Sequence, residues 1–261
     1  MTPLQRRRAI VKQLLDSGAV SVRDLSETFD VTKVTIRADL DYLENRGLVV
    51  KSHGGAVMPE TDDHMRFISK TIHENHDKKN SIARCAAGLV QPGSTVILDA
   101  GSTNAILARH LHGYDITVVT NSVPVIGELV SDDRIDLIAV GGAIRKQVNA
   151  MVGELARRSF ASMHADILFL GASGYAVREG VSTVNLLEAD TKQAMIDAAR
   201  FVCLLIDSTK YNDVKFAKVC DWSSVDQIIT DSITTETRRA LEEQGVKVTV
   251  AAVGTPASQP R

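Results

Sequence analysis

The sequence predicts an α/β chain with two unequal parts, a small helical unit followed by a larger unit in which strands and helices alternate. Three observations lead to this prediction. Residues 1–58 carry apolar side chains at helical spacing, with capping residues between the segments. Residues 59–76 are polar and begin with proline, which is typical of a linker. Residues 77–254 alternate apolar runs with helix-like segments, and the tail 255–261 is rich in Pro and Ser and should be frayed.

The composition predicts a cytoplasmic protein without disulfides. No apolar run among the 261 residues reaches the roughly 18 residues of a membrane span, and the N-terminus lacks the pattern of a signal peptide. The three cysteines are an odd number without a CxxC spacing, which suits a reducing compartment. Cys203 stands in the apolar run FVCLLI, so we expect a buried thiol.

Charge is distributed in the direction that nucleic-acid binding by the small unit requires. Residues 1–58 hold nine Lys/Arg against seven Asp/Glu, a net charge of +2, which leaves −4 for the remainder of the chain. This charge difference is small, so the helix pattern is the stronger indication of nucleic-acid binding.

The small unit is predicted to form three helices and a hairpin. A first helix over about 4–15 ends at Gly18, and Ser21 and Thr32 are suitable N-caps for two more. Only a few residues separate the second helix from the third, as a helix-turn-helix over about 20–39 requires. The run LVVKSHGGAVM that follows predicts two short strands, the wing of a winged helix-turn-helix.

The third helix is the predicted DNA-reading element. Ile36, Leu40 and Leu43 form one inward stripe, and the opposite face is free to enter the major groove at its N-terminal end. We expect Asp39, Asp41 and Glu44 to dilute the positive charge of this face. The candidate DNA contacts, to base edges or to phosphate, are Arg23, Thr32, Lys33, Thr35, Arg37, Lys51 and His53.

The larger unit is predicted to be a doubly wound α/β domain. Its apolar runs are nearly continuous, as in strands buried on both faces of a parallel sheet. The strands are expected at 95–99, 116–120, 135–140, 166–171, 201–207, 226–230 and 247–252. The helices are expected near 80–90, 104–111, 124–130, 151–160, 188–199 and 235–244.

Polar and small residues follow five successive strands of this unit. Because ligands of such sheets bind beyond the carboxyl ends of the strands, these residues predict one polar, anion-tolerant pocket. A helix follows the first of these strands, and its N-terminus would favour a phosphate. The residues concerned are Asp99, Gly101, Ser102, Thr103, Asn104, Thr120, Asn121, Ser122, Gly141, Gly142 and Ser173, with Asp207 to Lys210 after the fifth strand.

Motifs for other ligands are missing from the sequence. There is neither a GxGxxG after a strand nor a GxxxxGK[ST], so a dinucleotide or nucleoside-triphosphate site is not expected. The pairs His73/His76 and His110/His112 have no obvious third ligand, so we expect no metal. The sequence therefore predicts no cofactor.

The sequence resembles the DeoR/GlpR family of bacterial sugar-metabolism regulators. The stretch VSVRDLSETFDVTKVTIRADLDYLENRGLVVKSHGGA is similar to the family's DNA-binding signature. The later blocks ILDAGSTN, VVTNS, VGGAIR, MVGELA, FLGASG, GVST and DSTKY follow in the family's order. The chain departs from the family pattern at Ala38, where the family often has a second Arg, and at Lys51 and Lys70, where Arg is usual.

The resemblance implies a dimeric or tetrameric repressor of sugar-catabolic genes that a phosphorylated sugar releases from double-stranded operator DNA. It implies a sensor domain similar in fold to ribose-5-phosphate isomerase, in which Gly101 to Asn104 hold the phosphate. By the family pattern, Lys210 would lie in the same pocket and Glu188 would hydrogen-bond sugar hydroxyls. Ser173 stands where the isomerase would have a carboxylate, which favours sensing over turnover.

The residues are also compatible with two functions other than that of a regulator. An isomerase with an accessory head would need a carboxylate base, for which Asp99, Glu188 and Asp207 are the candidates. A winged helix that binds protein, joined to a vestigial α/β domain, would behave on DNA columns without salt dependence.

Overall fold

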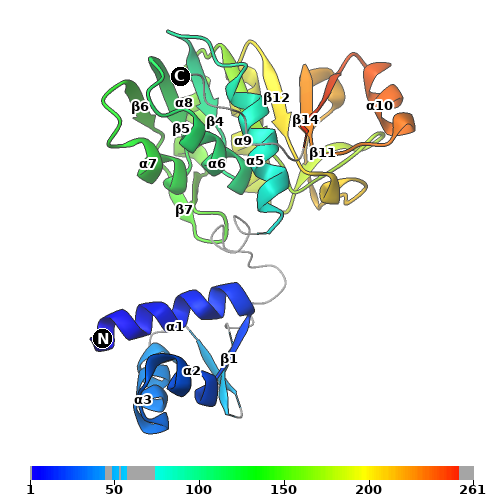
Figure 1. The fold of residues 1–261 in the computed structure, drawn as a ribbon. Coiled ribbons are helices and arrows are strands. Elements are labelled where there is room, and N and C mark those ends of the chain that lie inside the picture. The colour runs from blue at the N-terminus through cyan, green and yellow to red at the C-terminus, as the bar shows by residue number, and fades with distance from the viewer. Residues whose placement is uncertain (1, 45–48, 53, 58–73, 253–261) are drawn as a thin grey trace, which may run out of the picture. The chain divides into compact units, whose positions relative to one another are not determined.

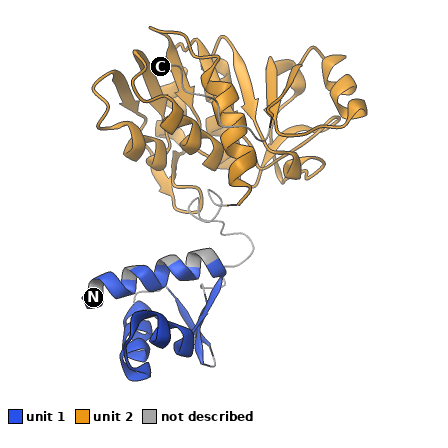
Figure 2. Cartoon of the chain, in the orientation of Figure 1, with its two compact units in different colours: residues 1–66 blue, residues 67–261 orange. Residues whose placement is uncertain are grey.

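The structure is a computed structural model that describes residues 2–44, 49–52, 54–57 and 74–252 (Figure 1). The chain divides into two compact units, residues 1–66 and 67–261 (Figure 2). Gly47, His53 and nearly all of the predicted linker lie outside the described residues.

The N-terminal unit contains the predicted helices, and its caps explain their ends. Thr2 and Gln5 form a capping box at the start of the first helix, and Gly18, at φ 76°, ends it. Ser21 and Thr32 accept hydrogen bonds from the backbone N–H groups three residues later, which confirms both as caps. The helices are α1 (Pro3–Ser17), α2 (Val22–Phe29) and α3 (Lys33–Glu44).

Three strands form the wing sheet, one more than the hairpin we predicted. The order is β1 (Ala19–Ser21), β3 (Gly55–Val57), β2 (Val50–Ser52). A Cβ at Gly55 would lie 2.0 Å from the backbone oxygen of Val20, so only glycine permits β1 to pair this closely with β3. The helices pack onto this sheet through a core that includes Ile10, Leu14, Leu25, Ile36, Leu40 and Leu43.

The C-terminal unit is built on a seven-stranded parallel sheet, which confirms the doubly wound prediction and all seven strands. The order is β15-β14-β12-β9-β4-β5-β6. The strands are β4 (Thr95–Leu98), β5 (Ile116–Thr120), β6 (Ile135–Ala139), β9 (Ile167–Gly171), β12 (Val202–Leu205), β14 (Gln227–Thr230) and β15 (Lys247–Val250).

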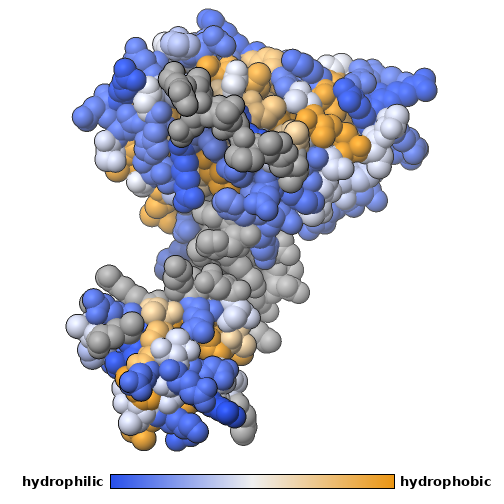
Figure 3. Space-filling view, viewed as in Figure 1, coloured by the Kyte–Doolittle hydropathy of each residue, from blue (hydrophilic) through white to orange (hydrophobic). Residues whose placement is uncertain are grey.

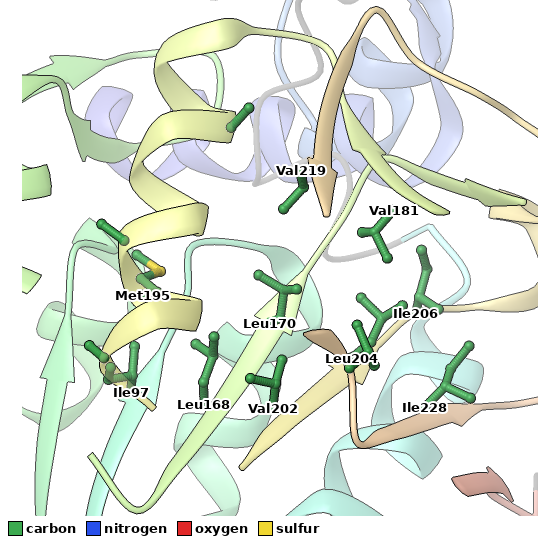
Figure 4. Close-up of a cluster of buried hydrophobic side chains, with 14 of the residues drawn as sticks. Ile97, Leu168, Leu170, Val181, Met195, Val202, Leu204, Ile206, Val219 and Ile228 are labelled. Carbon is green, nitrogen blue, oxygen red and sulfur yellow. The ribbon is translucent and has the colours of Figure 1, made fainter. Parts of the chain in front are cut away.

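Alternate residues of the central strands face two separate cores, so helices cover both faces of the sheet. Leu168 and Val202 belong to one core, and Phe169 and Cys203 to the other. Figure 4 shows the first core, where Met195 approaches the sheet residues Ile97 and Leu168. Helices α8 (Glu154–Ala161), α9 (Leu186–Ala198) and α10 (Thr235–Glu242) pack on this face, and α5 (His76–Ala87), α6 (Ser102–His110) and α7 (Val123–Leu129) pack on the other.

Five short strands beside the main sheet were not predicted. Strands β7 (Ala143–Arg145) and β8 (Ala150–Val152) form a hairpin after β6. The helix predicted over 151–160 is therefore wrong at its start: residues 150–152 pair with β7, and α8 begins only at Glu154. A second small sheet contains β10 (Gly174–Ala176), β11 (Gly180–Thr183) and β13 (Ala217–Cys220).

Hydrophilic residues predominate on the face of each unit that Figure 3 shows, and the hydrophobic ones gather in small patches. In the described ranges, no helix is both long and apolar enough to cross a membrane.

Candidate functional site

The sheet order brings the five polar strand ends to one edge of the C-terminal unit. The strands that precede them, β12, β9, β4, β5 and β6, are consecutive neighbours and run parallel. Their carboxyl ends therefore share an edge, as the sequence predicted, and this edge is the candidate ligand site.

A buried ion pair between Asp99 and Lys192 forms the base of this edge. Oδ2 of Asp99 accepts from Nζ of Lys192 and, at 2.9 Å, from the backbone N–H of Gly171. Oδ1 accepts from the backbone N–H of Ala100 at 2.7 Å. Both oxygens are thus occupied by protein donors, and the carboxylate joins the end of β4 to the end of β9.

The N-terminus of α6 is open toward the same edge. Gly101 is its N-cap, and no side chain caps the helix in the described part of the chain. Asn104 donates from Nδ2 to the Phe169 carbonyl at 2.9 Å, while its Oδ1 is buried without a partner among the described residues. Free first-turn N–H groups and the helix dipole make this end suited to an oxyanion. Ser102 and Thr103 lie in that first turn.

The three predicted residues after β5 mainly build the edge. Thr120 donates from Oγ1 to the Leu98 carbonyl at 2.6 Å, and Ser122 caps α7. Asn121 donates from Nδ2 to the Met151 carbonyl at 2.9 Å, and Met151 donates its N–H back to the Asn121 carbonyl at 2.9 Å. The hairpin β7–β8 is therefore fastened to the end of β5.

Glu188, at the start of α9, is held by two partners. Its Oε1 accepts from Nε of Arg145 at 2.6 Å, and its Oε2 accepts from Oγ1 of Thr183 at 2.8 Å. Oγ of Ser173 lies 3.3 Å from Oγ1 of Thr183. Arg145 and Glu188 form a nearly neutral pair that faces the edge from the hairpin side. Gly141 and Gly142 lead from β6 into this hairpin.

The loop after β12 is fixed to the start of α5. Asp207 caps the short 3₁₀ turn Ser208–Lys210, whose Ser208 donates from its backbone N–H and its Oγ to Asp231 at 2.6 and 2.9 Å. Lys78 of α5 contacts Oγ of Ser208 and the Asp231 carboxylate, both at 3.1 Å. Burial opposes the charged form of Asp231, but these hydrogen bonds outweigh it and leave its pKa below the ordinary value. Lys210 is half-buried at the end of the turn.

In the N-terminal unit, the structure exposes most of the predicted DNA contacts on α3. Thr32, Lys33 and Arg37 are exposed, and Thr35 is half-buried with its Oγ1 2.9 Å from that of Thr32. Arg23 lies on α2 and pairs with Glu27 at 3.1 Å.

The expectation that Asp39 dilutes the positive face is wrong. Asp39 is buried and accepts from Nε of Arg6 at 2.5 Å and from Nε of Arg7 at 2.7 Å. Arg7 also lies over the Tyr42 ring, 3.7 Å from its centroid. The sequence pattern missed this because the partners stand on another helix, more than thirty residues away.

Lys51 of the wing pairs with the two other acids of α3. Its Nζ lies 2.6 Å from Asp41 and 3.3 Å from Glu44, and these carboxylates raise the pKa of Lys51. A hollow of about 320 Å³ lies between α3 and the wing, and Arg37 and Lys51 both line it. The structure thus brings together two predicted DNA contacts from separate elements.

Two family profiles match the chain. The DeoR C terminal sensor domain matches residues 74–232, and the DeoR-like helix-turn-helix domain matches residues 6–62. The chain belongs to the DeoR family. This confirms the resemblance and makes the protein a helix-turn-helix transcription regulator rather than an enzyme.

DeoR-family relatives match over most of their length. A putative aga operon transcriptional repressor of Escherichia coli O157:H7 is 34% identical, over 94% of this chain and 92% of its own. An L-fucose operon activator of Haemophilus influenzae is 31% identical, over 87% and 91%. Among solved structures, ribose 5-phosphate isomerase A of Methanocaldococcus jannaschii has a TM-score of 0.39 and 18% identity, over 53% of this chain and 55% of that one.

The DeoR-family sensor contains functional candidates that were not in the predicted site. Lys192 neutralises Asp99, and Lys78 ties α5 to the loop after β12. Lys192 follows Glu188 by four residues on one helix, a spacing that could have placed it at the same edge. The three carboxylates that an isomerase could use as a base, Asp99, Glu188 and Asp207, all accept hydrogen bonds from the protein. In the described ranges, no cluster of His, Cys, Asp and Glu is arranged to hold a metal.

Proposed function

We propose that this DeoR-family regulator represses sugar-catabolic genes in the cytoplasm and leaves its operator when a phosphorylated sugar binds the sensor. The observation that carries the proposal is the uncapped N-terminus of α6 at the shared carboxyl edge of the sheet. A phosphate there would accept hydrogen bonds from the first-turn N–H groups, and the hydroxyls of Ser102 and Thr103 would lie beside it. Similarity to a relative named as an aga operon repressor supports the link to sugar genes.

The rest of the proposed ligand follows from the charges around this edge. Lys210 would add positive charge near the phosphate. The nearly neutral Arg145–Glu188 pair, by contrast, offers donors and acceptors without a net charge. Such a pair suits sugar hydroxyls better than a second anionic group. The proposed ligand is therefore a sugar with one phosphate.

The proposed DNA-binding unit is residues 1–58, joined by a linker over 59–76 to a sensor over 77–254. Two copies of the chain would present two α3 helices to the half-sites of an operator. Sugar binding would favour a state that cannot place both helices. Typical coupling between two such sites is about 1–3 kcal/mol, or about 5- to 150-fold in affinity.

The deciding experiment is a titration of full-length protein on DNA from its own upstream region, with a panel of sugar phosphates at fixed salt. Tight binding that one compound reverses supports the whole proposal. Specific binding that no sugar phosphate reverses contradicts the ligand but keeps the repressor. The absence of specific binding at any salt contradicts the DNA-binding role and favours a protein partner for the helices.

Arg37→Ala should weaken operator binding by about 1–3 kcal/mol, or about 5- to 150-fold, because an exposed Arg on α3 would lose a base or phosphate contact. The measurement is the dissociation constant at fixed salt. Arg200→Ala is the control, since Arg200 is an exposed Arg on the sensor unit with one weak partner, Asp166 at 3.6 Å. If the two variants bind the operator with equal affinity, the assignment of α3 to the DNA interface is wrong.

Ser102→Ala combined with Thr103→Ala should leave operator binding unchanged and raise the sugar-phosphate concentration needed for release by at least about tenfold. The reason is that each lost hydrogen bond between a hydroxyl and the charged phosphate costs about 1.5–3 kcal/mol of binding free energy. Ser159→Ala, which removes an exposed hydroxyl bound to its own helix, is the control. Release at the normal concentration would place the phosphate elsewhere.

A further inference from the structure

Helix α3 carries an exposed apolar strip that does not pack into the core of the N-terminal unit. Val34 is 73% exposed, and Ala38 is exposed one turn later on the same face. The opposite face holds the buried Ile36, Leu40 and Leu43. In the described part of the N-terminal unit, the only other exposed large hydrophobic side chain is Val50 in the wing, at 43%.

The charges around this strip indicate what covers it. Every acid of α3 has a cationic partner: Asp39 pairs with Arg6 and Arg7, and Asp41 and Glu44 share Lys51. Lys33 and Arg37, which lie next to Val34 on one side of the helix, form no ion pair within the described ranges. The free charge of the helix is therefore positive and lies beside the apolar strip.

Nucleic acid in its double-stranded form complements this combination. Phosphates along one edge of the major groove would attract the two cations. Within the groove, the apolar group that bases offer is the 5-methyl of thymine, which accepts contact from small aliphatic side chains. An apolar protein partner would leave Lys33 and Arg37 without counter-charges.

We propose that Val34 and Ala38 select thymine in the operator half-site by contact with its 5-methyl group. The inference rests on the proposed DNA-binding function and adds a base preference to it. Ala38 contributes because it is short: an Arg at this position would cover the strip with a cation. The expected operator has at least one thymine among the bases that face the first two turns of α3.

The test removes single methyl groups from the DNA. The full-length protein first selects its preferred sequence from a random duplex library. Each thymine of that sequence is then replaced by deoxyuridine, and dissociation constants are measured at fixed salt for the wild-type protein, Val34→Ala and Val50→Ala. For the wild-type protein, replacing one or two of the thymines in each half-site should lower the affinity about fourfold each. The reason is that each replacement removes one methyl group from an apolar contact.

The variants assign that loss to a side chain. Val34→Ala should bind the unmodified sequence less tightly and should lose its sensitivity to deoxyuridine at one of these positions. Val50→Ala, the matched control from the wing, should keep the wild-type pattern. Failure to select any sequence would overturn the proposed function together with this inference. Specific binding that is unaffected by deoxyuridine, or a sensitivity that survives in Val34→Ala, would overturn the inference alone.

Discussion

Replacing Asp39 with alanine is expected to cost the N-terminal unit about 3–5 kcal/mol, because it leaves Arg6 buried without a counter-charge. The unit has about 66 residues and so a total stability of roughly 3–10 kcal/mol. The loss should therefore unfold much of the population and abolish DNA binding through the fold, although Asp39 itself is buried. Amide hydrogen exchange in the full-length chain measures this, since it reports α1 and α3 separately from the sensor.

Asp41→Ala is the control for this prediction. Asp41 lies on the same helix, but it is exposed and its partner Lys51 is exposed as well. An exposed pair contributes about 0–1 kcal/mol, so exchange in α1 should hardly change. If Asp39→Ala exchanges no faster than Asp41→Ala, the buried pair does not stabilise the unit.

Lys192→Met is expected to destabilise the sensor unit by about 3–5 kcal/mol, because Asp99 remains buried without its cation. The protein contains one tryptophan, Trp222, which is buried in the core of this unit. Its fluorescence during urea unfolding therefore follows the sensor without interference from the N-terminal unit. The expected result is a lower urea midpoint with an unchanged slope.

A second variant separates charge from shape at this site. Adding Asp99→Asn to Lys192→Met removes both charges, and part of the lost stability should return. Lys218→Met removes an exposed lysine that pairs with Asp221, and it should leave the free energy of unfolding within about 0.5 kcal/mol of the wild type. A double variant less stable than Lys192→Met would show that the hydrogen bonds of Asp99, rather than its charge, hold the strand ends.

Local patterns predicted the elements because their signals lie within one element. The apolar runs predicted at 95–99 and 201–207 both contain strands of the sheet. Gly18, Ser21 and Thr32 end or begin helices through bonds to residues at most four positions away. The common edge followed as well, since parallel strands carry their loops to the same side.

Local patterns could not predict which side chains form ion pairs within the site. Asp99 meets Lys192, and Glu188 meets Arg145, across separations of 93 and 43 residues. Which cation neutralises which acid depends on how α9 and the hairpin β7–β8 pack over the sheet. That hairpin was itself missed, because three-residue strands are too short to show a period.

The strand order also determines when each part of the chain can function during synthesis. The N-terminal unit closes within residues 2–57, through contacts between neighbouring elements. In the sensor, Val96 of β4 pairs with Ile167 of β9, and β9 in turn pairs with β12. The ligand edge thus stays incomplete until the chain beyond β12 has left the ribosome. Such distant pairings fold slowly. A newly made chain therefore has a folded N-terminal unit before it has a folded sensor, and under the proposed function the regulator would acquire its response to ligand last.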